Sequence, residues 1–370
     1  MEKRKLGTSD VSILGYGCMR FPQKENKIDE ELALEQLRYG YDNGINYFDT
    51  AWPYHNGESE VVVGRFLKTI DRTTVFIADK MPTWDIDSVE KLDIIFNKQL
   101  EKLGTDYIDY YLLHCLTIDN FEKVKKFEMI SWIENKKKEG KIRNFGFSFH
   151  DHYDLFEEII NQTKWDFVQI QLNYVDENYQ AGLKGLNYAK EKGIDVIIME
   201  PLRGGILANS NNQVAAIMEK AIEKKSPVAW ALRYLWNQEG IKILLSGMND
   251  LNHIKDNIEI AKTSKLNTLT ADDLKIIEEL KNFYQVKIKV PCTGCNYCMP
   301  CPHGVDIPSC FSYYNASEMA DDKEFFQYNA ILDDSKKANN CLKCGICEPK
   351  CPQNIGIIDA LEEVKARFGE

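Results

Sequence analysis

The chain has 370 residues, of which 44% are apolar and 28% are charged, and its formal net charge is -11. This length exceeds that of one ordinary domain and leaves room for a large core and a smaller second module. The acidic balance disfavours nonspecific attraction to nucleic acid or anionic lipid. No run of about 18 uncharged apolar residues occurs, and the N-terminal MEKRKLGTSD lacks the apolar segment of a secretory signal. We therefore expect a cytoplasmic protein with neither a nucleic-acid nor a membrane partner.

Short apolar segments rich in β-branched and aromatic residues recur at intervals of roughly 30 residues, the length of a strand-helix-strand unit. The stretch before them, residues 1 to 12, predicts a small capping hairpin around Gly7. The recurring segments predict eight parallel strands, which are Ile13 to Cys18, Asn46 to Ala51, Val75 to Lys80, Tyr107 to His114, Arg143 to Phe149, Phe167 to Asn173, Asp195 to Pro201 and Ile241 to Met248.

Helical patterns lie between these strands. In Asp29 to Asn43 and Ser88 to Leu103, apolar residues recur at three- and four-residue intervals, and Gly44 and Gly104 follow as C-terminal stops. The alternation favours a closed (β/α)8 TIM barrel of the α/β class. The rival is a doubly wound open sheet, which usually carries G-x-G-x-x-G after its first strand, and Gly15 to Arg20 lacks the third glycine.

A change of composition marks the predicted domain boundary. One more amphipathic helix is expected from about Thr270 to Tyr284, and a different kind of segment begins after Pro291. We therefore expect the barrel to span residues 1 to 285 and a small, mostly α-helical domain to span residues 286 to 370.

The second segment is rich in cysteine: nine of the 11 cysteines follow residue 291, and eight of these nine form two tight motifs. The first motif is C-x2-C-x2-C-x2-C-P, and the second is C-x2-C-x2-C-x3-C-P. In two-cluster ferredoxins, three closely spaced thiolates bind one 4Fe–4S cluster and the fourth cysteine, before proline, binds the other. The predicted ligand sets are Cys292, Cys295, Cys298 and Cys351 for one cluster, and Cys341, Cys344, Cys347 and Cys301 for the other.

A pair of four-cysteine zinc sites is the alternative, although zinc sites usually separate their C-x2-C pairs by a long spacer. The insert between the motifs carries helical patterns from about Ile307 to Ala316 and near Glu324 to Leu332. It therefore resembles the insert of all-helical ferredoxin domains. The first motif departs from the usual gap of three residues before its last cysteine.

Four polar residues follow the predicted strands at the barrel end that carries active sites. Asp49, Lys80 and His114 end the second, third and fourth strands, and Tyr54 lies in the loop after the second. A tyrosine of pKa about 10 is a weak acid unless a cation stabilises its phenolate. Lys80 can be that cation, and Asp49 compensates its buried charge. His114 can orient a substrate oxygen.

These residues carry a resemblance to the aldo-keto reductase family over about residues 1 to 285. The matching motifs are Phe48-Asp49-Thr50-Ala51-x-x-Tyr54, Lys80-Met81-Pro82 and Leu112-Leu113-His114. The resemblance implies NADP(H)-dependent carbonyl reduction, with NAD(H) as the alternative cofactor, by the tetrad Asp49, Tyr54, Lys80 and His114. With its cysteine tail, the chain is similar to the bacterial subgroup that carries a ferredoxin-like domain.

The same resemblance implies a set of cofactor contacts. Ser148 and Gln169 match the residues that hold the nicotinamide carboxamide, and Met199 occupies the position of the stacking aromatic residue. Leu202 and Gly204 belong to a segment that can offer backbone donors to the pyrophosphate, because glycine permits close approach; a plain turn is the alternative. The remaining predicted contacts lie at the ends of the first, second and last predicted strands or shortly after them. They are Gly17, Cys18, Met19, Asp49, Ser246, Gly247, Met248, His253, Asp256 and Asn257.

Three functions fit these patterns. The first is a nicotinamide-dependent reductase of a small carbonyl compound, whose clusters exchange electrons with a ferredoxin or another electron-transfer protein. The second is a reductase fed mainly through the clusters, which Phe149 (at a family asparagine position) and Met199 favour. The third is a noncatalytic barrel with structural clusters, which the intact tetrad disfavours.

Overall fold

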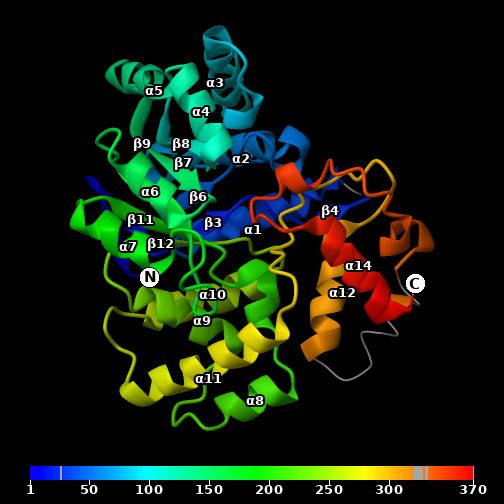
Figure 1. Ribbon diagram of the computed structural model, residues 1–370. Coiled ribbons are helices and arrows are strands. Elements are labelled where there is room, and N and C mark those ends of the chain that lie inside the picture. The colour runs from blue at the N-terminus through cyan, green and yellow to red at the C-terminus, as the bar shows by residue number, and fades with distance from the viewer. Residues whose placement is uncertain (26, 320–327, 330–331, 370) are drawn as a thin grey trace. The chain divides into compact units, whose positions relative to one another are not determined.

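The computed structural model describes residues 1–25, 27–319, 328–329 and 332–369. Eight parallel strands close into a barrel and follow one another around it in chain order (Figure 1). The predicted barrel and all eight predicted strand segments are confirmed. The barrel strands are β3 Leu14–Gly17, β6 Tyr47–Asp49, β7 Phe76–Met81, β8 Ile108–Leu116, β9 Ile142–Phe149, β10 Phe167–Gln171, β11 Asp195–Met199 and β12 Ile241–Ser246.

Helices connect the strands, and local sequence sets their ends. The Asp29 side chain accepts a hydrogen bond from Leu32 N and caps the first helix. Ser88 caps the third helix, which ends at Gly104 with φ +62°, a backbone region that glycine enters freely. The helices from the barrel sequence are α1 Glu30–Asp42, α2 Ser59–Leu67, α3 Val89–Leu103, α4 Ile118–Lys126, α5 Met129–Lys138, α6 Tyr153–Ile160, α7 Gly182–Glu191, α8 Asn212–Met218, α9 Pro227–Trp236, α10 Leu251–Thr263 and α11 Ala271–Lys287.

The N-terminal hairpin packs on the barrel interior. Its strands, β1 Lys3–Leu6 and β2 Ser9–Ser12, pair antiparallel, as predicted. Leu6 belongs to the same buried cluster as inward residues of the barrel strands, and Tyr110 Oη donates to Leu6 O at 3.1 Å. A second short hairpin pairs β4 Gln23–Lys24 with β5 Lys27–Ile28.

Contacts divide the chain into two compact units: Met1–Pro201 with Ala231–Leu269, and Leu202–Trp230 with Thr270–Glu370. In the second unit, Tyr284 Oη donates to Asn209 O at 3.3 Å and Asn211 Nδ2 donates to Met319 O at 3.1 Å. The boundary after residue 285 stays a prediction.

The second unit has its own apolar core. It includes Phe311 of α12 Ile307–Met319 and Leu361 of α14 Ile357–Phe368. The first of these helices confirms the pattern expected from Ile307. The helix expected near Glu324 to Leu332 lies mostly outside the described residues. No described helix is long and apolar enough to cross a membrane.

Candidate functional site

The inward side chains of the barrel lie in layers, because alternate residues of each strand face the interior. One layer is apolar and contains Tyr47, Ala78, Leu112, Phe167, Ile197 and Leu245. Gly15 pairs with Leu245, and Gly146 pairs with Leu112, so these two glycines share that layer. Two residues further along each strand, the next inward positions are Gly17, Asp49, Lys80, His114, Ser148, Gln169, Met199 and Gly247. Strand geometry thus gathers predicted site residues from all eight strands in one ring.

Lys80 is the centre of this ring. Its Nζ lies 2.6 Å from Asp49 Oδ1, 2.7 Å from Thr50 O and 3.3 Å from Tyr54 Oη. Lys80 is 1% exposed and Asp49 is 2% exposed. An ammonium at this depth needs close partners, and the carboxylate and the Thr50 carbonyl provide them. Asp49, Lys80 and Tyr54 therefore form one hydrogen-bonded group.

Burial sets the protonation of this group. Burial raises the pKa of Tyr54 to about 12, although Lys80 lowers it. Burial alone lowers the pKa of Lys80, but the charges of Asp49 and Tyr54 outweigh it, so the net pKa lies above its usual value. We expected the cation to stabilise the phenolate of Tyr54; it does so, but the loss of solvent has the larger effect. At neutral pH the phenol is protonated and the lysine is charged.

His114 lies beside this group. Its ring is edge-on to Tyr54, with centroids 6.0 Å apart, and it is 5.0 Å from the ring of Trp84. Burial lowers the pKa of His114 well below its ordinary value, and the charges of Lys80 and His150 add to the effect. His114 is therefore a neutral imidazole that can hydrogen-bond a substrate oxygen.

Tyr54 is followed by a strained turn, and a lysine side chain stabilises this turn. His55, Asn56 and Gly57 follow Tyr54 with φ of 52°, 55° and 87°, and such left-handed residues need support from their surroundings. Lys102 provides it from α3: its Nζ donates to Gly57 O at 3.0 Å and lies 4.2 Å from the centroid of Trp52. Lys102 could not be predicted from the motif, because it lies far from Tyr54 in the chain.

The predicted carboxamide contacts lie side by side. Gln169 pairs with Ser148 across β10 and β9, and Ser148 Oγ accepts a hydrogen bond from Cys115 N at 2.8 Å. Gln169 is 3% exposed, and its Oε1 has no hydrogen-bond partner among the described residues. Phe149 faces the other way: its ring packs on Phe156 of α6, with centroids 5.2 Å apart.

Two hydrogen bonds hold some of the other predicted cofactor contacts, and the rest lie in different surroundings. Cys18 N donates to Asp49 O at 2.8 Å, which ties the first strand to the ring. Asn257 Nδ2 donates to Ser246 Oγ at 3.0 Å. The other residues lie in several surroundings: Met19 and Met199 half-buried, Met248 buried, His253 and Asp256 exposed on α10, and Leu202 and Gly204 in the second compact unit.

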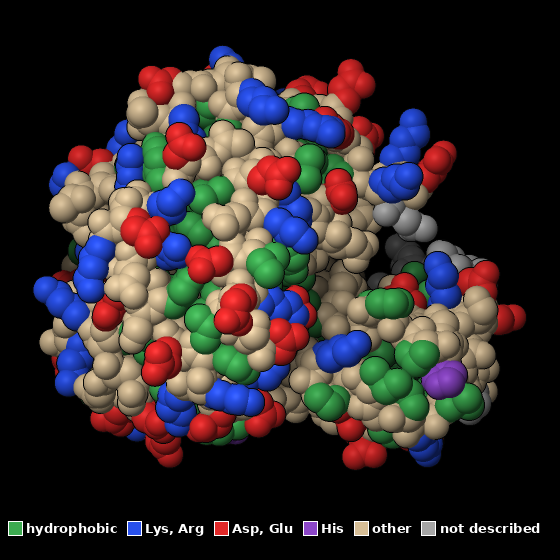
Figure 2. Space-filling model, turned by 90° about the horizontal axis from the view of Figure 1, so that it is seen from above, with side chains coloured by type: hydrophobic (Ala, Val, Ile, Leu, Met, Phe, Trp, Pro, Cys, Tyr) green, Lys and Arg blue, Asp and Glu red, His purple; other side chains and the backbone are tan. Residues whose placement is uncertain are grey.

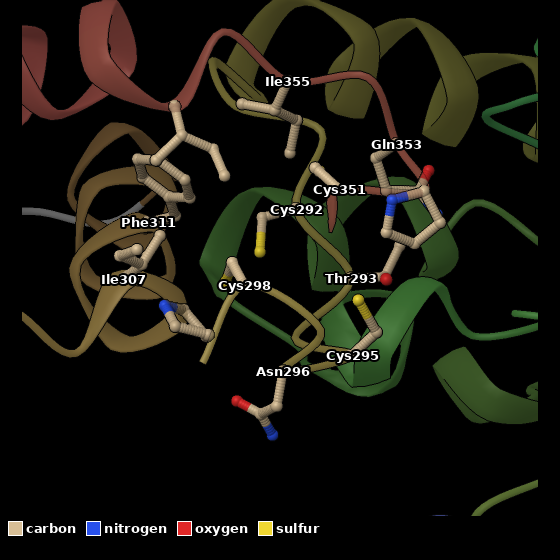
Figure 3. Close-up of a pocket in the computed structure, with 13 residues that line it drawn as sticks. Cys292, Thr293, Cys295, Asn296, Cys298, Ile307, Phe311, Cys351, Gln353 and Ile355 are labelled. Carbon is tan, nitrogen blue, oxygen red and sulfur yellow. The ribbon is translucent and has the colours of Figure 1, made fainter. Parts of the chain in front are cut away.

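Four predicted cluster ligands line one pocket. Figure 3 shows Cys292, Cys295 and Cys298 on one loop, with Cys351 beside them. Burial raises the pKa of the Cys298 thiol, and the nearby Cys295, Cys292 and Cys351 add to the effect. Across the described residues, no three His, Cys, Asp or Glu side chains converge closely enough for a single metal ion.

The second motif repeats the local geometry of the first. Gly294 N donates to Cys292 Sγ, and Lys343 N donates to Cys341 Sγ, each at 3.4 Å. Gly294 has φ 65°, and Lys343 has φ 56°. Burial raises the pKa of the Cys347 thiol, and Cys341 and Cys301 are among the neighbours that add to the effect. Thus Cys301 lies with the second motif, and Cys351 lies with the first.

A parallel eight-stranded barrel with this polar ring at the C-terminal ends of its strands defines a TIM-barrel enzyme. Residues 13–282 match the family model described as "Aldo/keto reductase family", and the chain belongs to that family of oxidoreductases. Residues 291–355 match the model of a 4Fe-4S dicluster domain.

Curated relatives share the barrel part of the chain. An uncharacterized oxidoreductase, YqkF, from Bacillus subtilis is 28% identical over 75% of this chain and 96% of its own length. The NADH-specific methylglyoxal reductase of Escherichia coli is 28% identical over 57% of this chain and 70% of its own length.

Solved structures share the fold. Aldo-keto reductase AKR11C1 from Bacillus halodurans, in its holo form, has a TM-score of 0.63 and 25% identity, covering 76% of this chain and 96% of its own. An aldo-keto reductase from Klebsiella pneumoniae has a TM-score of 0.60 and 19% identity, with the same two coverages of 76% and 96%.

Proposed function

We propose that this chain reduces a small carbonyl compound with NADP(H), and that two 4Fe–4S clusters in its C-terminal part exchange electrons with a ferredoxin or another electron-transfer protein. The observation that carries the proposal is the hydrogen-bonded group of Asp49, Lys80 and Tyr54, with the ring of His114 edge-on to Tyr54. The barrel would act in the cytoplasm on a soluble substrate.

Tyr54 is the proposed general acid. Its pKa of about 12 keeps the phenol protonated at neutral pH, so a proton is available when negative charge develops on the substrate oxygen. Lys80, 3.3 Å from the phenol oxygen, stabilises the phenolate that remains after proton transfer. Asp49 holds the Lys80 ammonium in place, and neutral His114 orients the carbonyl oxygen.

The residues present fit a nicotinamide dinucleotide. When bound, the reduced nicotinamide supplies the hydride that attacks the carbonyl carbon. The buried Gln169 Oε1, with no partner among the described residues, can accept from a carboxamide, and Ser148 lies beside it in the register. The predicted contacts of Leu202 and Gly204 with the pyrophosphate stay predictions.

The choice between NADP(H) and NAD(H) is part of the proposal. One relative is named an NADH-specific methylglyoxal reductase, so NAD(H) is the alternative cofactor. Its name also makes a small dicarbonyl compound a suitable first substrate for assays.

The cysteine sites fit clusters. Four thiols line one pocket, and each motif has a backbone N–H that donates to a cysteine sulfur. Such N–H donors stabilise thiolate ligands and tune cluster potentials. Two clusters in one small domain would carry single electrons to and from a partner, while hydride transfer in the barrel needs no iron.

A second candidate is a reductase fed by reduced ferredoxin through the clusters. Met199, a half-buried thioether at the predicted stacking position, favours it, because a thioether stacks on nicotinamide less well than an aromatic ring. An anaerobic titration with NADPH and NADH separates the two candidates. Binding of either dinucleotide with a measurable dissociation constant supports the first candidate. The absence of binding supports the second candidate.

The proposed acid is tested with Tyr54→Phe in the holoprotein. Carbonyl reduction should fall by roughly 10²- to 10⁴-fold, while the dissociation constant of the dinucleotide stays nearly unchanged. Tyr41→Phe is the matched control, because the Tyr41 hydroxyl meets Thr74 at an exposed site. Normal turnover by Tyr54→Phe would show that another group donates the proton.

A further inference from the structure

A second histidine follows strand β9 at the active-site end of the barrel. His150 comes two residues after Ser148, so strand alternation gives it the inward position above Ser148. Its backbone N donates to Leu116 O at 3.0 Å, which joins it to the strand that carries His114. His150 is 7% exposed. The tetrad chemistry uses none of its atoms.

The imidazole of His150 has an unused polar atom. Its Nδ1 has no hydrogen-bond partner among the described residues, whereas buried polar atoms are nearly always hydrogen-bonded. Burial lowers the pKa of His150 to about 4, although a hydrogen bond with Gln180 raises it. At neutral pH the ring is therefore uncharged, and its Nδ1 makes no hydrogen bond to any residue that the structure describes.

His114 and His150 lie close enough to influence each other. A positive charge on His150 would disfavour protonation of His114, and this is one cause of the lowered pKa of His114. Both rings are neutral, so the pair offers hydrogen bonds without offering a charge. Such a pair suits two uncharged oxygens, a carbonyl and a neighbouring keto or hydroxyl oxygen, better than it suits a carboxylate.

We propose that His150 binds a second substrate oxygen, on the carbon next to the reacting carbonyl, so that the site selects 2-oxo and 2-hydroxy aldehydes over simple aldehydes. This inference rests on the proposed function, with His114 on the reacting oxygen. A substrate that lacks the second oxygen leaves a buried polar atom unsatisfied, and this cost provides the discrimination.

The test compares two aldehydes that differ by one oxygen. Lactaldehyde and propanal are reduced by the full-length, anaerobically purified protein, and the ratio of their kcat/KM values is measured. We expect wild type to prefer lactaldehyde and His150→Leu to lower the ratio by about tenfold, the usual effect of one hydrogen bond. The product analogues give a second readout: 1,2-propanediol should inhibit more strongly than 1-propanol, and His150→Leu should reduce the difference.

Two polar variants keep the test decisive where leucine is not tolerated. The amide nitrogen of Asn occupies the place of Nδ1, and that of Gln occupies the place of Nε2. His150→Asn should keep the kcat/KM ratio of lactaldehyde to propanal within about threefold of wild type. His150→Gln should lower this ratio as His150→Leu does. His152→Leu, at an exposed position two residues on, is the control and should match wild type.

The outcomes separate this inference from the proposed function. An unchanged ratio in His150→Leu and in His150→Gln, with turnover intact, overturns the role of His150 alone. A wild-type protein that reduces neither aldehyde with NADPH or NADH overturns the proposed function and this inference together.

Discussion

The carbonyl oxygen of Thr293 lies 2.3 Å from the position that a Cβ atom would take on Gly204. Thr293 stands between Cys292 and Cys295, on the loop that lines the first cysteine cavity. Gly204 has φ +66°, a conformation that glycine adopts without strain. Within the second compact unit, the loop after β11 and the first cysteine loop therefore meet backbone to backbone.

Gly204→Ala should disturb the first cysteine site. The new methyl group would collide with a backbone carbonyl that cannot rotate away, and we expect a loss of about 2 kcal/mol in stability together with reduced iron content. Gly193→Ala is the matched control, because Gly193 has φ +71° and no atom within 4 Å of the added Cβ. Equal iron content in Gly204→Ala and Gly193→Ala would contradict the prediction.

Iron analysis of paired cysteine variants tests the crossed ligand sets. Anaerobically purified wild type should hold about eight iron and eight sulfide per chain. Cys292→Ser with Cys351→Ser should retain about four iron, because both changes fall on one site. Cys292→Ser with Cys301→Ser should retain almost none. A colourless protein with stoichiometric zinc would contradict the cluster assignment.

His150 should make stability depend on pH. Its pKa of about 4 in the folded chain lies below the ordinary value of 6.5, so the unfolded chain binds more protons between these values. The contribution of neutral His150 to the free energy of unfolding is therefore complete above about pH 6.5, and it is lost as the pH falls toward about 4. From pH 7.5 to pH 5, wild type should lose about 2 kcal/mol more than His150→Leu in denaturant unfolding. If the free energy of unfolding falls equally in wild type and in His150→Leu, the pKa of His150 is not lowered by folding.

Removing the second site should separate the two proposed activities. Cys341→Ser with Cys344→Ser disables one cluster and leaves the residues around Lys80 untouched. Electron transfer with a protein partner should collapse, while NADPH-driven reduction of a simple aldehyde should persist. If both activities disappear together with the thermal transition of the barrel, the clusters are structural.

Local patterns in the sequence predicted the barrel and the residues of the ring. The eight strands could be identified because each is a short apolar segment between amphipathic helices, and Asp49 and Lys80 could be placed because they end such segments. His150 was missed, since one histidine after a strand forms no motif. The available signal was its two-residue spacing from Ser148, which has meaning only once Ser148 is known to face inward.

Long-range packing and burial could not be predicted in the same way. The sequence indicated that Lys80 would favour the phenolate of Tyr54, but the extent of burial, which raises the net pKa to about 12, depends on the whole barrel. Likewise, the grouping of Leu202–Trp230 with Thr270–Glu370 depends on contacts between residues far apart in the chain. The two cysteine motifs are the exception, because their spacing alone predicts the crossed arrangement.

That crossing has a consequence for biosynthesis. On the proposed ligand sets, the first motif emerges from the ribosome with three ligands for one site and a single ligand for the other. Neither cluster can be completed until the second motif, which supplies Cys351 to the first site, has also been synthesised. Cluster insertion is then coupled to the synthesis of the second motif, and a chain that lacks this motif would offer the assembly machinery only incomplete sites.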